Sequence, residues 1–391
     1  MVKLGPGGKL LLIVMGLGIL AFTVDRYVGR ERVLVLLGQK EPPARRPRLS
    51  SGDFPAGAAA PVGDLAALLN RPVRLTALPR GSTVVPLVAL GGVGLRKDSP
   101  LSRAYGIEGE LTLSQDEGHL AQALVLGGEH AGADAAIVTV DRLPAIRDAA
   151  RDAKLKAVML VSWSRGHDAV AAVGGVDQIA SLKGRKVAIP EGPGRFFLFW
   201  HLAQAGLSVG DLGDVRVKSA TEAALFLREG RVEAAAGIAQ ELAGPAKERG
   251  GRLIATTADA PFLIADVLVV RSEFLARYPD SVRRLVRGLT DAGEAVLKDP
   301  TEGAKLLGAS APLLDTPPEA IKSDPPATLA ENLAFFGLRG NAPVRFDELY
   351  ASAAGLLAKL GEPSDGSAAV DARELGPLLS AIAPTGAPGN P

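Results

Sequence analysis

Residues 185–200 read RKVAIPEGPGRFFLFW, a short apolar strand followed by a Pro-x-Gly turn and the start of an apolar helix. The same order occurs in the first half of the chain, where residues 73–83 read VRLTALPRGST and another apolar stretch follows. Short runs of Val, Ile, Leu and Ala that end in Pro and Gly are typical of buried strands closed by a turn. The two stretches therefore predict the same strand, turn and helix unit twice in one chain.

A second pair of matching segments follows these units. Ser114 and Ser219 each precede a Glu by three residues, which is the Ser-x-x-Glu pattern of a helix capping box. We expect each helix to run about ten residues and to stop at glycine, at Gly127 and at Gly230, because glycine readily adopts the left-handed conformation of a helix end. Apolar strands are then expected over residues 133–140 and 232–239.

The repetition predicts an α/β protein made of two similar lobes. Ser219 lies 105 residues after Ser114, and the turn at Pro190 lies 111 residues after that at Pro79. Strands separated by helices of this length form parallel α/β units. Open α/β sheets bind ligands at the carboxyl ends of their strands, where helix N-termini present free N–H groups. We therefore expect both Pro-x-Gly turns to face a ligand cleft between the lobes.

The composition excludes several classes of function. Among 391 residues, 44 Lys and Arg balance 43 Asp and Glu, and the chain lacks the clustered basic residues that nucleic-acid binding requires. The absence of cysteine excludes disulfides, thiolate metal sites and thiol catalysis. The four histidines show no metal-binding spacing, so neither a metal nor a cofactor is expected.

The N-terminus carries one uncharged segment, Leu10 to Val24, which allows three interpretations. It is short for a transmembrane helix, but Lys9 and Arg26 can reach the lipid headgroups, and we expect an uncleaved anchor. A cleaved signal peptide and a buried helix are the alternatives. Basic residues are more numerous after the segment than before it, which opposes an outward orientation. Residues 1–28 are thus expected to be the anchor or signal segment, and residues 29–72 a linker.

Three longer stretches carry a resemblance to a known family. They are residues 181–212 (SLKGRKVAIPEGPGRFFLFWHLAQAGLSVGDL), 219–244 (SATEAALFLREGRVEAAAGIAQELAG) and 264–300 (IADVLVVRSEFLARYPDSVRRLVRGLTDAGEAVLKDP). Together they resemble the SsuA-like class of ABC-transporter substrate-binding proteins, which handles sulfonates, taurine, nitrate and thiamine precursors. Shorter stretches at 161–170, 331–338 and 370–375 resemble a branch of that class that is often fused to an OmpA-type domain.

The resemblance implies a type II periplasmic-binding-protein fold, with two α/β lobes joined by two crossover strands. It places lobe one at residues 73–163 and 266–391, and lobe two at residues 164–265. It also implies a non-enzymatic solute-binding protein that captures a small anionic or zwitterionic solute and delivers it to an ABC permease. We expect a monomer in the bacterial inner membrane, with its soluble domain in the periplasm, or secreted there after cleavage. A membrane-anchored sensory or scaffold protein with the same ligand-binding fold is the alternative.

The candidate ligand-binding residues lie in the turns and strand ends that face the expected cleft. Arg80 and Arg195 suit bidentate contact with a sulfonate, carboxylate or phosphate, although each also fits a solvated loop arginine. Asp141 either binds an amine or caps the helix after it, and Trp163 forms either a cleft wall or part of the core. The remaining candidates supply N–H, hydroxyl, amide or charged groups: Gly81, Ser82, Thr83, Thr139, Ser164, Arg165, Glu191, Gly194, Gln240, Glu241 and Asp266.

Overall fold

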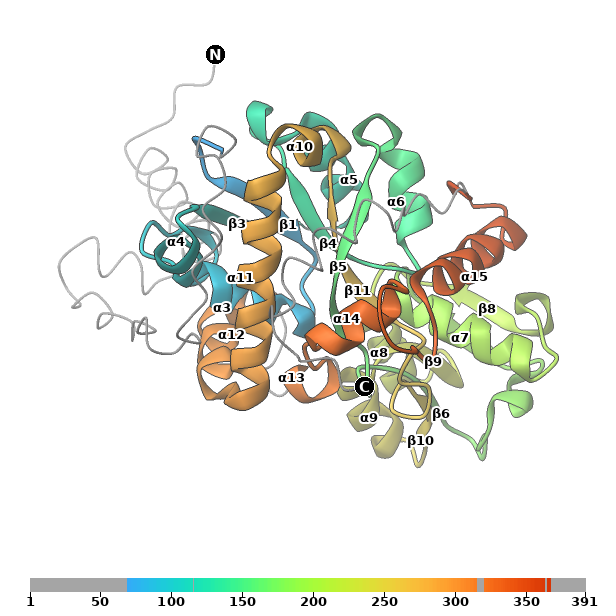
Figure 1. Cartoon of the computed structure of the whole chain (residues 1–391). Coiled ribbons are helices and arrows are strands. Elements are labelled where there is room, and N and C mark those ends of the chain that lie inside the picture. The colour runs from blue at the N-terminus through green and yellow to red at the C-terminus, as the bar shows by residue number, and fades with distance from the viewer. Residues whose placement is uncertain (1–68, 115, 315–319, 363, 367–391) are drawn as a thin grey trace, which may run out of the picture. The chain divides into compact units, whose positions relative to one another are not determined.

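The first of two β-sheets is built from strands that lie far apart in the sequence (Figure 1). The structure is a computed structural model that describes residues 69–114, 116–314, 320–362 and 364–366. The sheet has the order β2-β3-β1-β4-β11-β5. Its strands are β1 (Val73–Ala77), β2 (Gly94–Leu95), β3 (Gly109–Leu113), β4 (Ala135–Thr139), β5 (Lys156–Trp163) and β11 (Ala265–Val270).

The centre of this sheet is covered on both faces. Every residue of β4 and β11 is buried, and their sequences, AAIVT and ADVLVV, are the near-continuous apolar runs that such strands need. Strand β1 pairs in parallel with β3 and β4, whereas β11 runs antiparallel between β4 and β5. The carboxyl ends of β1, β4 and β5 therefore meet the amino end of β11 at one edge of the sheet.

The second sheet has the order β10-β6-β9-β7-β8. Strand β7 pairs in parallel with β8 and β9, and β6 runs antiparallel between β9 and β10. The carboxyl ends of β7 and β9 consequently share an edge with the amino end of β6. Its strands are β6 (Asp168–Ala172), β7 (Lys186–Ile189), β8 (Gly213–Arg216), β9 (Ala234–Ile238) and β10 (Arg252–Thr256).

The chain passes between the two sheets twice, and the two passages lie side by side. It leaves the first sheet after Trp163 and returns to it at Ala265. The backbone N–H of Ser164 donates to the carbonyl of Ile264 at 2.9 Å, which joins the two passages. The result is a mixed α/β fold of two lobes, in which the second sheet and its helices form an insertion into the first lobe.

Helices cover both sheets, and the longest of them, α11, buries one apolar stripe. In α11, Val282, Leu285, Val286 and Leu289 recur at helical spacing and are all 0% exposed. The first lobe contains η3 (Gly81–Thr83), α3 (Val84–Leu90), α4 (Pro100–Tyr105), α5 (Glu117–Leu126), η4 (Gly128–His130), α6 (Leu143–Ala149), η5 (Arg151–Ala153), α10 (Ser272–Arg277), α11 (Pro279–Lys298), α12 (Pro300–Leu314), α13 (Ala320–Ser323) and α14 (Leu329–Phe335). The second lobe contains η6 (Ile179–Leu182), α7 (Pro193–Gln204), η7 (Val209–Asp211), α8 (Ala220–Arg228) and α9 (Ala239–Glu248).

Helix α15 (Phe346–Lys359) packs against both lobes (Figure 1). Ala353 and Leu356 join the apolar cluster of the second lobe that contains Phe197 of α7. On the side of the first lobe, the Tyr350 hydroxyl accepts a hydrogen bond from Arg147 of α6 at 3.0 Å. The C-terminal helix therefore links α6 to the core of the second lobe.

The capping box predicted at Ser114 is wrong. The residue that caps α5 is Asp116, whose carboxylate accepts the N–H of His119 at 2.8 Å. The Ser114 hydroxyl is instead hydrogen-bonded to the hydroxyl of Thr76 at 2.9 Å, so it joins β1 to the strand end beside it. Asp is as good a helix cap as Ser, which is why the pattern placed the start two residues early.

The capping residue predicted in the second lobe is confirmed. Ser219 accepts the N–H of Glu222 at 3.1 Å. The Glu222 carboxylate accepts the N–H of Lys218, one residue before the cap, at 2.7 Å, and so departs from the reciprocal capping box. Both helices end at the predicted glycines, and Gly127 and Gly230 have φ angles of 74° and 77°. The ψ angle of Gly127 is 158°, so this residue does not adopt the left-handed helical conformation that we expected.

Across residues 69–114, 116–314, 320–362 and 364–366, no helix combines the length and apolar character that crossing a membrane requires. The segment Leu10 to Val24 and the linker after it lie outside the described residues. The N-terminal anchor stays a prediction.

Candidate functional site at the boundary between the lobes

The facing edges of the two sheets hold most of the predicted site residues. From the first lobe, the end of β1 leads to Arg80 and the end of β4 supplies Thr139 and Asp141. From the second lobe, the end of β7 leads to Arg195 and the end of β9 to Glu241. Ser164 and Asp266 lie on the two passages between the lobes. The parallel strand ends thus gather these side chains at one boundary, as the repeated turns predict.

Arg80 is enclosed by three carboxylates from different parts of the chain. Its Nη2 lies 3.1 Å from Asp168 Oδ2 and 3.8 Å from Asp324 Oδ1, and its Nε lies 3.5 Å from Asp266 Oδ1. Asp168 belongs to β6 of the second lobe, so this contact ties the two lobes together. The Arg80 side chain is only 11% exposed. Arg80 is therefore a buried bridging cation, and the solvated-loop alternative is wrong.

The three carboxyl groups around Arg80 differ in their affinity for protons. Burial raises the pKa of Asp324 to about 7 and that of Asp266 to about 6, although Arg80 partly offsets both. Burial acts in the same direction on Asp168, but there the guanidinium of Arg80 prevails and lowers the pKa. A buried site holds one carboxylate more easily than three, because each further negative charge is costly to bury. Asp168 has the lowest pKa of the three, so it is the principal counterion of Arg80 near neutral pH.

His167 completes this cluster as a neutral group. Its Nδ1 lies 3.2 Å from Asp324 Oδ2, and the residue is 4% exposed. Burial, followed by the nearby charge of Arg80, lowers the pKa of His167 to about 4. A neutral imidazole can donate from Nδ1, while Nε2 has no hydrogen-bond partner among the described residues. His167 was not predicted as a site residue, because it has no recognisable spacing to another ligand.

Asp141 is a buried carboxyl group and not a helix cap. The residue that precedes α6 is Arg142, and the prediction that Asp141 caps this helix is wrong. Asp141 is 2% exposed, and neither of its carboxyl oxygens has a hydrogen-bond partner of good geometry within the described chain. Burial raises the pKa of Asp141 to about 7. A carboxyl group buried in this way is costly unless it holds a proton or meets a ligand donor.

The last residue of β5, Trp163, lies in the core, and the residues after it lie at the boundary between the lobes. Trp163 is 2% exposed and meets Phe262 and Phe335 edge to face at 5.4 and 5.2 Å, so it is a core residue and not a cleft wall. The Ser164 hydroxyl donates to Asp168 Oδ2 at 2.8 Å and orients the counterion of Arg80. Arg165 pairs with Glu331 of α14 at 2.6 Å, which neutralises it within the first lobe.

A second group of alternating charges lies around Arg195 at the start of α7. Arg195 Nη1 and Nη2 lie 2.7 and 2.8 Å from the two carboxylate oxygens of Glu362, a bidentate pair. Arg142 of the first lobe reaches the same carboxylate at 3.5 Å and pairs with Glu117 at 2.8 Å. Burial lowers the pKa of Arg195, and the charge of Arg142 acts in the same direction. Arg142 and Arg195 thus share the carboxylate of Glu362 across the boundary.

The other predicted residues contribute backbone geometry or lie at the surface. The N–H of Gly81 donates to Asp324 Oδ2 at 3.1 Å, and the Thr83 hydroxyl accepts the N–H of Arg80 at 3.1 Å. Ser82 and Thr139 are buried, with exposed fractions of 1% and 6%. Glu191 and Gln240 are exposed, and Gly194 packs against Gly237. Glu241 lies close enough to His167 for its charge to oppose the lowering of the His167 pKa.

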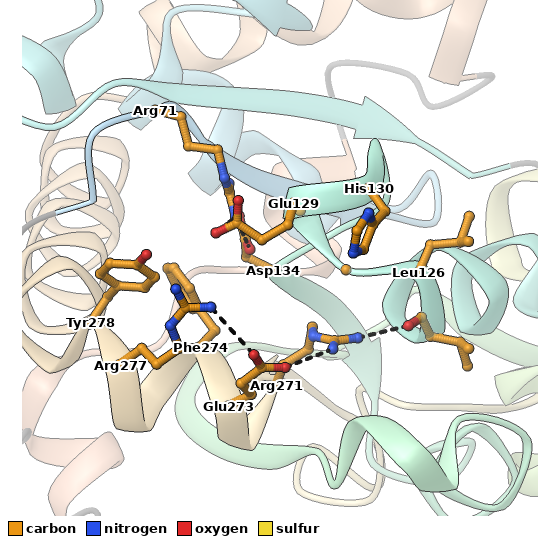
Figure 2. A pocket seen from close by; sticks show the side chains of 13 residues that line it. Arg71, Leu126, Glu129, His130, Asp134, Arg271, Glu273, Phe274, Arg277 and Tyr278 are labelled. Atoms are coloured by element: carbon orange, nitrogen blue, oxygen red, sulfur yellow. Dashed lines mark hydrogen bonds and ion pairs between the residues drawn. The ribbon is translucent and has the colours of Figure 1, made fainter.

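A cavity of about 260 Å³ lies at the opposite edge of the first sheet (Figure 2). Arg71 and Asp134 precede β1 and β4, and Arg271 follows the antiparallel β11, so all three lie at the amino edge of the parallel strands. Arg71 forms a bidentate pair with Asp134 at 2.7 and 2.8 Å. Arg271 donates to the carbonyl of Val125 at 2.9 Å. All of the residues that line this cavity belong to the first lobe, so it is a site separate from the boundary between the lobes.

Sequence reasoning missed several partners that complete the boundary. Asp168 and Asp324 supply the counterions of Arg80, and Arg142 and Glu362 form the group around Arg195. Of these four residues, only Arg142 could have been found from the sequence, because it directly follows the end of a buried strand and the candidate Asp141. Within the described ranges, no group of three or more metal-ligating side chains has the geometry to hold a metal ion.

The fold and this boundary define a class of protein, the mixed α/β proteins in which a second lobe is inserted into the first. A family model described as NMT1/THI5 like matches residues 106–303, just over half of the chain. The chain belongs to this family. The match confirms the resemblance to SsuA-like substrate-binding proteins and covers strands of both lobes.

Solved structures show the same fold at low sequence identity. The aliphatic sulphonate-binding protein SsuA of Escherichia coli matches with a TM-score of 0.58 and 15% identity, over 76% of this chain and 91% of that one. The alkanesulfonate-binding protein SsuA of Xanthomonas axonopodis pv. citri, bound to MOPS, matches with a TM-score of 0.55 and 15% identity, over 75% of this chain and 96% of that one. A mutant of the desulfurization enzyme DszB matches with a TM-score of 0.52 and 15% identity, over 80% of this chain and 99% of that one.

Sequence comparison finds binding proteins of the genus Brucella. A protein of Brucella abortus named as a binding protein is 28% identical over 159 residues, which are 39% of this chain and 48% of that protein. The chain thus matches about half the length of this relative. The solved structures establish the fold, and they include both binding proteins and an enzyme.

Proposed function

We propose that the protein binds a small anionic or zwitterionic solute between its two lobes and releases it unchanged. The observation that carries this proposal is the charged boundary itself. Arg80 of the first lobe contacts Asp168 of the second at 3.1 Å, and the unsatisfied carboxyl group of Asp141 lies buried at the same boundary. Contacts made by both lobes exist together only when the lobes are closed, so a ligand that makes them shifts an open–closed equilibrium.

The pair of arginines Arg142 and Arg195 favours a solute with a negative group, and Asp141 favours an additional positive group on the solute. Arg142 and Arg195 face a shared carboxylate, and guanidinium groups suit the planar or tetrahedral oxyanions of carboxylates and sulfonates. Asp141 offers a buried acceptor whose oxygens make no hydrogen bond of good geometry within the described chain. An ammonium group on the solute would offset the cost of ionising this carboxyl group.

Binding without catalysis accounts for the residues better than an enzyme does. The SsuA structures carry the names of binding proteins, whereas DszB is named as an enzyme on the same fold. This chain contains no cysteine, and His167 has the lowered pKa of a buried neutral imidazole beside Asp324. A nucleophile activated by an adjacent base is the usual sign of covalent catalysis on such a site. The Ser164 hydroxyl donates to Asp168, but this carboxylate is a weak base because Arg80 lowers its pKa.

An ABC permease partner and a location at the outer face of the bacterial inner membrane complete the proposal. The support is the family and the uncharged segment Leu10 to Val24. Proteolysis of intact spheroplasts tests the location, and degradation of the domain after Tyr27 is the expected result. Protection of that domain would overturn the location. Failure of a coexpressed neighbouring permease to copurify with the protein would favour the sensory or scaffold alternative.

The test of solute binding is a titration of the whole chain with taurine, methanesulfonate, acetate, phosphate and nitrate, followed by calorimetry and thermal unfolding. A solute at one hundred times its dissociation constant stabilises the folded state by about 2.7 kcal/mol. We expect at least one probe to bind with a heat signal and to raise the melting temperature. No binding by any probe would contradict the proposed solute class.

A further inference from the structure

We propose that Arg142 and Arg195 form a two-lobe clamp for the oxyanion of the solute, and that the carboxylate of Glu362 occupies this clamp until a solute displaces it. The inference rests on the proposed function and specifies which charged groups take the ligand. It also assigns a role to the segment after α15, which carries Glu362 to the boundary between the lobes.

The geometry at Glu362 is that of a bound carboxylate ligand. Arg195 contacts both of its oxygens, at 2.7 and 2.8 Å, and Arg142 contacts the second oxygen at 3.5 Å. Both arginine side chains are 11% exposed. The arginines come from opposite lobes, since Arg142 follows β4 and Arg195 lies in the first turn of α7. A bidentate contact with a second cation alongside it is the arrangement that favours carboxylate, sulfonate or phosphate.

Glu362 differs from the acidic partners of Arg80 because it is accessible. Its side chain is 26% exposed, whereas those of Asp168, Asp266 and Asp324 are 3%, 2% and 0% exposed. It lies three residues beyond the last residue of α15, outside regular structure. Rotation of this one side chain into solvent therefore exposes the clamp without unfolding either lobe.

The backbone around Glu362 is held in place by other contacts, so the exchange involves only its side chain. The N–H of Asp365 donates to the carbonyl of Pro144 at 2.9 Å, and its carboxylate lies 3.2 Å from Arg147. The Tyr350 hydroxyl donates to the carbonyl of Asp365 at 2.6 Å. These contacts anchor the segment on α6 and α15 while Glu362 leaves the clamp.

The exchange conserves charge at the boundary. Arg142 keeps Glu117 as a partner at 2.8 Å throughout. Arg195, whose pKa burial lowers, needs one anionic partner to stay charged at low cost, and an incoming oxyanion replaces the one that Glu362 provides. An uncharged solute cannot make this exchange, which predicts selection against neutral analogues of equal size.

The experiment compares the affinities of the whole chain and of single variants for the panel of five probes given above, by calorimetry. Glu362→Gln removes the competing charge, and we expect it to bind the best probe about tenfold more tightly, which corresponds to about 1.4 kcal/mol. Arg195→Met removes the bidentate contact and should weaken binding more than tenfold, while Arg195→Lys should retain part of it. Glu331→Gln, which removes the carboxylate that pairs with Arg165, is the matched control and should leave affinity within twofold.

Two outcomes would overturn the clamp. If the wild type binds a probe and Glu362→Gln binds it no more tightly, Glu362 is not a competitor, although the solute-binding function stands. If neither the wild type nor Glu362→Gln binds any probe, the proposed function fails together with the clamp. Thermal unfolding confirms that each variant is folded, and Glu362→Ser provides a second neutral variant.

Hydrogen exchange supplies a readout independent of affinity. The backbone N–H groups of Leu360, Gly361 and Glu362 donate to carbonyls of α15, so saturation of the wild type with the tightest probe should leave their exchange unchanged. Increased exchange at these residues would show that the segment itself moves, and would contradict an exchange confined to the side chain of Glu362.

Discussion

The two Pro-x-Gly turns present equally buried arginines but surround them differently. Arg80 and Arg195 are each 11% exposed. Arg80 contacts three carboxylates that are at most 3% exposed, and its partners come from β6, β11 and the residue after α13. Arg195 contacts one carboxylate that is 26% exposed and lies near the end of the described chain. Sequence repetition thus produced the same turn twice, and tertiary contacts gave the two copies different roles.

The two arginines differ in whether a ligand can replace their counterions. Of the counterions of Arg80, Asp168 and Asp266 lie next to the two passages between the lobes, and Asp324 accepts the N–H of Gly81, so removing them would disturb the backbone around the boundary. Glu362 is tied to the clamp only by its side chain. An arginine with fixed counterions supports structure, whereas an arginine with a replaceable counterion can bind a solute.

The largest expected effect comes from neutralising the arginine of the first turn. Arg80→Met leaves three buried carboxyl groups without a cation, and we expect the free energy of unfolding to fall by about 3–5 kcal/mol. Arg195→Met leaves only the accessible Glu362 and should cost about 1 kcal/mol. Urea unfolding of both variants at pH 7 measures the comparison. Equal losses would contradict the distinction between a structural and a ligand-binding arginine.

Glycine substitutions test the packing of the two turns. A Cβ at Gly81 would lie 2.6 Å from the Cβ of Asp324 and 2.8 Å from the carbonyl oxygen of Ala320. We therefore expect Gly81→Ala to destabilise the fold by about 1–3 kcal/mol. At Gly194 the nearest atoms belong to Gly237 at 3.1 Å, and the helical gain of alanine, about 1 kcal/mol, should offset the contact. A larger loss for Gly194→Ala in thermal or urea unfolding would reverse the predicted order.

The buried carboxyl group of Asp141 predicts a pH dependence of stability in the first lobe. Its pKa is about 7 when folded and near 4 when unfolded, so the unfolded state releases its proton first as the pH rises. This group therefore lowers stability progressively between about pH 4 and 7. Asp141→Asn should be more stable than the wild type at pH 8, by at most about 4 kcal/mol, and no more stable at pH 4.

Urea unfolding at the two pH values measures this difference. Glu191→Gln, at an exposed residue of the second turn, is the control and should follow the wild type at both. A gain for Asp141→Asn that is the same at pH 4 and pH 8 would show that burial does not hold the proton on Asp141.

The smallest effect concerns the helix starts that the sequence predicts in both lobes. Ser219→Ala and Asp116→Ala each remove a cap, and each should cost about 1 kcal/mol. Ser114→Ala should leave the start of α5 in place, because Asp116 and not Ser114 accepts the N–H of His119. Chemical shifts of residues 117–120 would report a displaced helix start in Ser114→Ala if the original pattern were correct.

The sequence allowed the fold to be predicted, and with it the edge at which the site forms. Strands ending at Ala77, Ile189 and Ile238 depend on local apolar runs and on the turns or helix starts that follow them. Their carboxyl ends gather at the boundary because parallel pairing orients them alike. The family resemblance added the two-lobe connectivity, and the N-terminal anchor lies outside the described residues.

The partners at the site could not be predicted in the same way. Asp168 lies 88 residues from Arg80 in the sequence, and Glu362 lies 167 residues from Arg195. Neither spacing is a motif, because the contacts arise only when the second lobe is inserted and α15 is packed against it. The misplaced cap at Ser114 has a different cause, since two adequate caps lie within three residues and the Thr76 hydroxyl engages one of them.

The amino-acid sequence by itself determined two strand, turn and helix units, their glycine stops, the edge where ligands meet such sheets, and the absence of thiol chemistry. These properties follow from short-range conformational preferences and from composition. The tertiary structure alone decided that Arg80 is enclosed by fixed carboxylates, that the carboxyl group of Asp141 is buried, and that Arg142 and Arg195 share Glu362. Charge pairing depends on distances across the folded chain, and those distances exist only once the lobes have formed.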